Sequence, residues 1–128
     1  MRECSQCHKL LSLDNYYKNG KERMYCCKDC HKKNIKATYD DKVAKVNEYK
    51  SSHGCKRCGD TRFYILDFHH PDPNQKDFNI SDKMRAKFET ILEEIEKCDV
   101  LCANCHREWH YRSTIEQLDY NAWLGELA

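Results

Sequence analysis

Cys102-Ala103-Asn104-Cys105-His106-Arg107-Glu108-Trp109-His110 carries most of the information on how this chain folds. The segment joins a cysteine pair at zinc-knuckle spacing to two histidines four residues apart, which share one face of a helix. A further pair, His69-His70, ends an aromatic and β-branched stretch earlier in the chain. We therefore expect imidazoles from both segments to meet at one metal ion, apart from the zinc that cysteines hold.

Cysteines supply the second pattern. Eight of the ten form Cys-x2-Cys pairs, the spacing at which two thiolates chelate one ion. We expect two structural Zn sites, one made by Cys4, Cys7, Cys27 and Cys30, the other by Cys55, Cys58, Cys102 and Cys105. Cys26 could compete with Cys27, but Cys27 keeps the two-residue gap to Cys30. A disulfide scaffold is the alternative; the lack of a signal-peptide pattern favours a reducing cytosol instead.

Composition limits the size of the core. The 128 residues have 40% apolar content, and their mean hydropathy is −0.96, so metal sites must help to hold the fold together. The net charge is only +1, yet residues 28–57 carry nine basic side chains against four acidic ones, whereas residues 85–128 carry five against nine. A local basic patch of this kind favours a nucleic-acid partner. No apolar run is long enough to suggest a membrane partner.

We expect a small α+β protein stapled by zinc, in three parts. Residues 1–30 form a zinc ribbon, residues 31–53 a basic linking helix, and residues 54–128 a second zinc-bound domain. The helix follows from apolar residues at intervals of three and four. Its lysines either face a nucleic acid or are merely solvated: Lys32, Lys33, Lys36, Lys42, Lys45 and Lys50.

Four elements are expected in the second domain. Residues 63–69 have the aromatic and β-branched content of a strand. Ser81 or Asp82 caps a helix whose apolar face runs from Met84 to Ile95. A short strand over 98–102 precedes a last helix from Cys105 to about Ile115. The apolar segment 120–124 packs on this core or on a second subunit.

The histidines suggest hydrolytic chemistry. We assign His69, His106 and His110 to a catalytic divalent cation and His70, on the opposite side of the strand, to a general base. Asp67 shares the face of His69 and either orients it or binds the ion. Three imidazoles suit Zn, Ni, Co or Mn better than Mg, unless Asp67 joins them. Planar guanidinium groups that fit phosphate are those of Arg62, Arg107 and Arg112.

The segments Leu66-Asp67-Phe68-His69-His70 and 102–110 resemble the HNH endonucleases, and in particular the small zinc-knuckled members found in phages and mobile elements. The resemblance spans residues 55–111 and implies a ββα-metal core that hydrolyses DNA phosphodiesters. It also implies His70 as the base and His69, His106 and His110 as metal ligands. A monomer or homodimer in the cytoplasm is implied, which is the bacterial host cytosol for a phage protein.

The chain departs from this family at one position. The central Asn of the motif, which braces the loop carrying the base, falls on Lys97, and Asn104 is a weak substitute. Three alternatives stay open. Histidines could complete structural zinc sites; the chain could be a noncatalytic zinc-dependent nucleic-acid-binding or adaptor protein; or it could be a zinc-stapled protein-interaction module.

Overall fold

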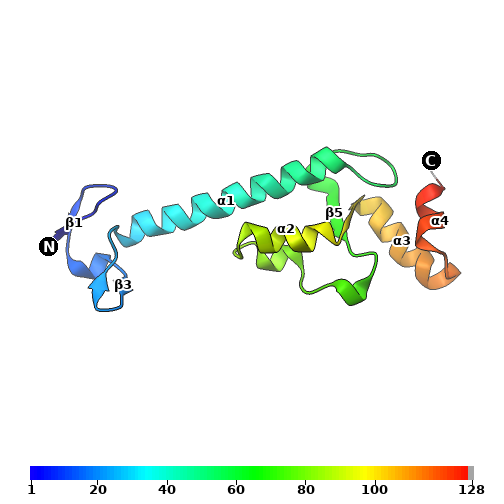
Figure 1. Cartoon of the computed structure of the whole chain (residues 1–128). Coiled ribbons are helices and arrows are strands. Elements are labelled where there is room, and N and C mark those ends of the chain that lie inside the picture. Colours follow the sequence, from blue (N-terminus) through cyan, green and yellow to red (C-terminus); the bar gives the residue numbers. More distant parts are fainter. Residues whose placement is uncertain (127–128) are drawn as a thin grey trace. The chain divides into compact units, whose positions relative to one another are not determined.

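The computed structural model describes residues 1–126 (Figure 1). It combines helices with three two-stranded sheets in this described range, which agrees with the mixed α and β class expected from the sequence. The chain forms two compact units, Met1–Asp41 and a second that begins at Lys42. The division falls inside the long helix α1, Lys28–His53, which extends beyond the predicted linking helix at its N-terminal end.

The first unit is built from two hairpins. Strand β1 (Arg2–Glu3) pairs with β2 (Leu10–Leu11), and β3 (Lys18–Asn19) pairs with β4 (Glu22–Arg23), both antiparallel. The 3-10 turn η1 (Leu13–Asn15) lies between the hairpins. Buried cysteines and Tyr16 make up its small core, and the Tyr16 hydroxyl donates to the Arg2 carbonyl at 2.7 Å. Because this unit buries so few apolar side chains, its cysteines are expected to be its main stabilisers.

The second unit contains an antiparallel pair followed directly by a helix. Strand β5 (Leu66–His69) pairs with β6 (Asp99–Cys102) in a register that sets His69 opposite Asp99. Helix α3 (Ala103–Glu116) begins immediately after β6, because the Cys102 Sγ caps it by accepting the Cys105 N–H. It therefore starts two residues before the predicted Cys105. This β5–β6–α3 order places a strand end beside the first turns of a helix.

Two further predicted boundaries were wrong. Residues 63–65 form a 3-10 turn, η2 (Phe63–Ile65), and only the remainder of the predicted strand is β5. No helix is capped by Ser81 or Asp82 in the described chain; these residues lie in the 3-10 turn η4 (Ile80–Lys83). Ile80 of that turn and Met84, which directly follows it, are buried in a cluster with Val46 of α1. Core burial therefore uses these apolar residues in and just after a turn, and α2 (Phe88–Glu96) begins only after Lys87.

The loop after β5 contains the 3-10 turn η3 (Pro73–Gln75). The last element of the described chain is α4 (Tyr120–Gly125). Its N-terminus is capped by the Asp119 carboxylate, which accepts the Ala122 N–H. Its Trp123 is fully buried, in a cluster with residues of β5 and β6 and with Cys55 and Cys105. The apolar C-terminal segment thus packs on the core of its own chain.

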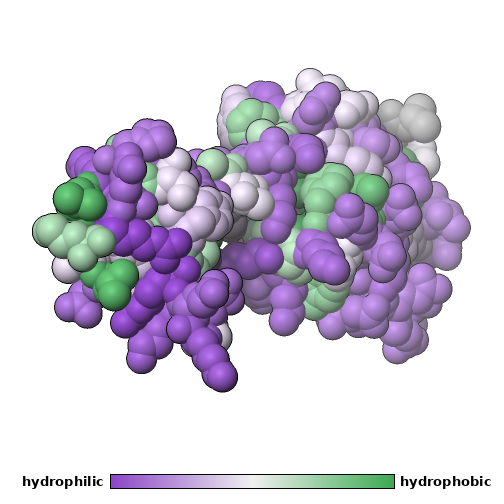
Figure 2. Space-filling model, turned by 60° about the vertical axis from the view of Figure 1, so that its left-hand side comes forward, coloured by the Kyte–Doolittle hydropathy of each residue, from purple (hydrophilic) through white to green (hydrophobic). Residues whose placement is uncertain are grey.

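The surface matches the low mean hydropathy. The face visible in Figure 2 is mainly hydrophilic, with small separate apolar patches. Among the helices of residues 1–126, none combines the length and apolar character needed to cross a membrane.

Candidate metal centres

All eight predicted cysteines fall into two groups of four. Within each group the Sγ atoms lie within 4.8 Å of one another. The Sγ atoms of Cys4 and Cys30 are 3.8 Å apart, and those of Cys58 and Cys102 are 3.7 Å apart. Two sulfurs bound to one tetrahedral zinc at about 2.3 Å stand roughly 3.8 Å apart. Both groups therefore have the donor set and spacing to hold a structural zinc, as expected from the sequence, and Cys26 lies outside them.

Backbone N–H groups favour thiolates in both clusters. Burial raises the pKa of Cys4, but hydrogen bonds from the N–H groups of Cys7, Cys27 and Gln6 outweigh it and bring the pKa to about 5. For Cys55, burial is similarly outweighed by backbone N–H groups, and its pKa is about 7. Each cluster thus holds one thiol that ionises readily, which is the form that binds zinc.

One further thiol in each cluster, Cys30 in the first and Cys105 in the second, has its pKa shifted in the opposite direction. Burial and the neighbouring thiol groups raise the pKa of Cys30 to about 12 and raise that of Cys105 as well. These thiols keep their protons in the absence of metal. Binding of a cation would displace these protons, and metal affinity therefore depends on pH.

A third group of donors consists of imidazoles. His69 ends β5, whereas His106 and His110 occupy successive turns of α3, and one nitrogen from each lies within 4.8 Å of the others. The Nε2 atoms of His106 and His110 are 2.9 Å apart, and the His69 ring centroid is 5.1 Å from that of His106. Imidazole nitrogens bind metals at about 2.0–2.1 Å. The three rings predicted to converge do so.

The surroundings of His69 show whether the three imidazoles fit a metal ion. The residue is only 6% exposed, and within the described residues its Nε2 is buried without a hydrogen-bond partner. Burial, and then the charges of His106 and His110, lower the pKa of His69 to about 4; burial also lowers that of His110. A neutral imidazole with an unsatisfied nitrogen costs free energy unless something binds it. A cation at this point would remove that cost.

Asp67 acts on a different histidine from the one expected. Its Oδ2 lies 3.4 Å from the Nδ1 of His106 and thus contacts the helix rather than orienting His69. Asp67 and His69 share one face of β5, and α3 crosses that face, so His106 comes to lie over the carboxylate. A carboxylate on the far nitrogen of a metal-binding imidazole fixes its orientation and raises its basicity.

His70 diverges from His69, as the alternation of a strand predicts. Its Nε2 lies 2.8 Å from the Oε1 of Glu94, a carboxylate that is only 1% exposed. Burial raises the pKa of Glu94, but hydrogen bonds from Lys97, the Asp77 N–H and His70 outweigh it, and the pKa is about 2. Glu94 was missed at the sequence level. The available signal was an acidic residue three positions after Ile91, on the apolar side of α2.

A pocket of about 410 Å³ adjoins these groups within the second unit. Asp67, His70 and His106 border it, and Lys50 and Lys76 add two ammonium groups. Its remaining walls are largely apolar: Val43, Val46, Phe68, Ile80 and Met84. Lys50 was among the predicted basic residues of the helix, whereas Lys76 lies in a loop that gave no such indication.

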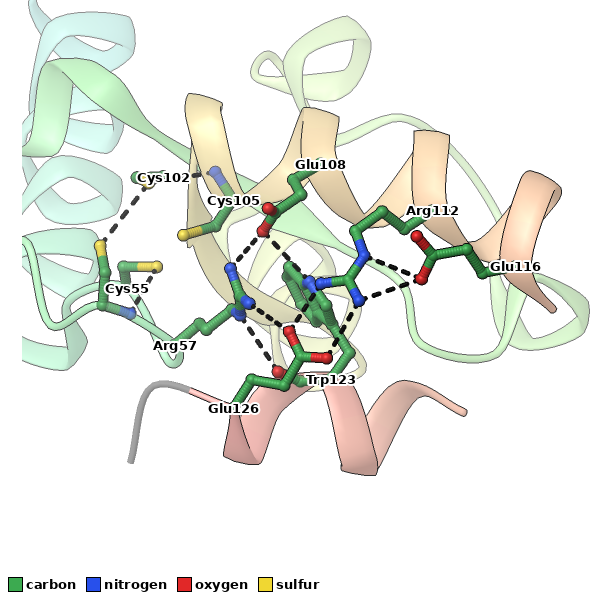
Figure 3. Close-up of polar contacts among 10 residues, drawn as sticks. Cys55, Arg57, Cys102, Cys105, Glu108, Arg112, Glu116, Trp123 and Glu126 are labelled. Carbon is green, nitrogen blue, oxygen red and sulfur yellow. Dashed lines mark hydrogen bonds and ion pairs between the residues drawn. The ribbon is translucent and has the colours of Figure 1, made fainter. Parts of the chain in front are cut away.

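The residues predicted to contact phosphate differ in their exposure and in their ion pairs. Lys32, Lys33 and Lys36 are exposed on α1, and Lys36 pairs with Asp40. Arg62 binds the Asp60 carboxylate, and Arg112 lies between Glu116 and Glu126 (Figure 3). Arg107 is exposed and, unlike Arg62 and Arg112, makes no ion pair with any residue of the described range.

Comparisons with protein-family models, curated proteins and solved structures gave no match for this chain. Its function therefore has to be inferred from the chemistry of these three clusters and of the pocket beside them.

Proposed function

We propose that the chain is a metal-dependent DNA endonuclease of the HNH type, with β5, β6 and α3 as its ββα-metal core and cysteine-bound zinc in both units. The observation that carries the proposal is the partnerless Nε2 of buried His69 beside the nitrogens of His106 and His110. Structural zinc is already provided for by eight cysteines, which leaves this third group for another role.

A divalent cation held there supplies positive charge that stabilises the oxygens of a phosphodiester as it is cleaved. His69, His106 and His110 would hold it, and Asp67 would orient His106. Three neutral nitrogens favour Mn, Ni or Zn over Mg, which prefers oxygen.

His70 is the proposed general base. With its Nε2 occupied by Glu94, the free Nδ1 accepts a proton from a water molecule whose oxygen attacks phosphorus. A P–O ester bond breaks, and the leaving oxygen takes up a proton from solvent. Lys50 and Lys76 border the same pocket as His70 and would contact phosphates beside the one cleaved.

A plasmid-nicking assay tests the proposal. Zinc-loaded protein is assayed with Mn, Ni, Zn and Mg, next to His70→Ala and a control, His8→Ala, which removes an exposed imidazole of the first unit. We expect nicking that His70→Ala reduces at least 100-fold while zinc content stays unchanged, since general bases contribute about 10²–10⁴-fold. His8→Ala should cleave like the unaltered chain.

Two results would contradict the proposal. Full activity of His70→Ala would remove His70 as the base. Absence of nicking with every metal, combined with salt-dependent DNA binding, would instead favour a noncatalytic zinc-dependent DNA-binding protein that uses exposed lysines such as Lys32 and Lys33. Cleavage of both strands would further require two successive nicks or a homodimer.

A further inference from the structure

Glu94 is an acidic side chain at a position where α2 otherwise buries apolar residues. It lies between Ile91 and Ile95 in the helix, and all three are almost fully buried. A buried carboxylate is retained only if hydrogen bonds and charges compensate its desolvation. The partners of Glu94 therefore indicate what it is there to hold.

Each oxygen of this carboxylate has defined partners. Oε1 is 2.8 Å from the Nε2 of His70 and accepts the Asp77 N–H at 3.0 Å. Oε2 accepts from the Lys97 ammonium at 2.8 Å. Lys97 also donates to the Asp77 carboxylate at 2.7 Å, which closes a ring of contacts. Glu94 thus joins helix α2 both to His70 and to the loop that follows it.

The direction of the His70 contact follows from the chemistry. An ionised carboxylate only accepts hydrogen bonds, so the proton between the two groups sits on the Nε2 of His70. In a neutral imidazole, one protonated nitrogen leaves the other as the acceptor. Glu94 therefore selects the tautomer in which Nδ1 has a free lone pair.

Contacts to the loop add positional control. The Asp77 N–H donates to Oε1 of Glu94, and the Lys97 ammonium joins Oε2 of Glu94 to the Asp77 carboxylate. Both oxygens of Glu94 therefore attach the loop to α2 at Asp77, seven residues beyond His70. Lys97, the residue that stands where the motif of the resembling family has Asn, completes this tie rather than leaving the loop without support.

We infer that Glu94, with Lys97 as its counter-ion, is a positioning residue that holds His70 in the Nε2–H tautomer and braces the loop after it, so that Nδ1 serves as the proton acceptor. This inference rests on the proposed function, in which His70 is the base. It concerns residues of the chain alone, and its first test needs no catalytic activity.

That test is the tautomeric state of His70, read from the ¹⁵N chemical shifts of its two ring nitrogens in the zinc-loaded full chain at pH 8. We expect a single tautomer with the proton on Nε2. A proton on Nδ1, a mixture of tautomers, or a doubly protonated ring would overturn the inference without any variant having to fold.

The matched variants are Glu94→Gln and Glu93→Gln. Both replace one carboxylate of α2 with an amide, but Glu93 is exposed. A glutamine at 94 has one oxygen for three donors, namely Lys97, the Asp77 N–H and His70. Because its NH₂ group must then face one of these donors, we expect a mixture of His70 tautomers, whereas Glu93→Gln keeps one.

Nicking kinetics supply the functional outcome. We expect Glu94→Gln to lower kcat about 10–100-fold, the usual loss when a supporting hydrogen bond is removed, with KM within twofold and two zinc ions still bound. Unchanged kcat together with an inactive His70→Ala would overturn the role of Glu94 and leave the nuclease proposal standing. An active His70→Ala would overturn both. Reduced kcat with an unchanged tautomer would show that Glu94 acts by general stability only.

Discussion

Arg57, which lies between Cys55 and Cys58, contacts both C-terminal helices, and its removal is expected to destabilise the second unit. Its guanidinium, only 7% exposed, binds the carboxylates of Glu108 in α3 and Glu126 after α4 (Figure 3). Its Nε donates to the Trp123 carbonyl at 3.1 Å, and the group stacks over the Trp123 ring at 4.4 Å from the centroid.

Arg57→Ala removes all four contacts and leaves Glu108 with only the Trp123 indole N–H as a side-chain partner in the described residues. The side chains of Glu108 and Glu126 are 42% and 38% exposed, so water can solvate their carboxylates once Arg57 is removed. We therefore expect a loss of about 1.5–3 kcal/mol, typical of hydrogen bonds to charged groups, which is less than for a fully buried ion pair. Arg62→Ala is the control, because Arg62 also pairs with a carboxylate but its side chain is 59% exposed. Exposed pairs contribute about 0–1 kcal/mol.

Urea unfolding followed by tryptophan fluorescence measures the difference. Both tryptophans, Trp109 and Trp123, belong to the second unit, so the signal reports its unfolding alone. Zinc is held at one saturating concentration, because bound metal shifts the apparent free energy of unfolding. If the free energies of unfolding of Arg57→Ala and Arg62→Ala differ by less than about 1 kcal/mol, the contacts of Arg57 do not stabilise the second unit more than an exposed ion pair does.

Three further outcomes are expected. Cys58→Ser should lower zinc content measured by mass spectrometry from two ions per chain to one, whereas Cys98→Ser, outside both clusters, should leave two; equal loss would reject the cluster assignment. Because the pKa of Cys4 is about 5, zinc binding to the first cluster at pH 7.4 should release at most three protons, and calorimetry that counts four would contradict a preformed thiolate. The pKa of His69 is about 4 when folded against 6.5 when unfolded, so the unfolded chain binds more protons between these values and the free energy of unfolding falls as pH is lowered through this window. His69→Gln should flatten that slope between pH 6.5 and about 4, and an unchanged slope would show that His69 is not the group responsible.

Local spacing along the chain was enough to predict which cysteines pair and which histidines share a helix face. A Cys-x2-Cys turn brings two sulfurs to one ion whatever surrounds it, so both cysteine clusters follow from the sequence. His106 and His110 share a face because four residues make about one helical turn. Alternation in a strand likewise sends His69 and His70 to opposite sides.

Contacts between distant segments decided the rest. The carboxylate that holds His70 comes from 24 positions further along the chain, and Arg112, a predicted phosphate contact, is instead bound by Glu126 of the C-terminal segment. The start of α2 was likewise set by burial of Ile80 and Met84 rather than by a capping residue. Spacing determines which face of its own element a side chain occupies, whereas the partner on that face depends on how helices and strands pack, and packing is a property of the folded chain as a whole.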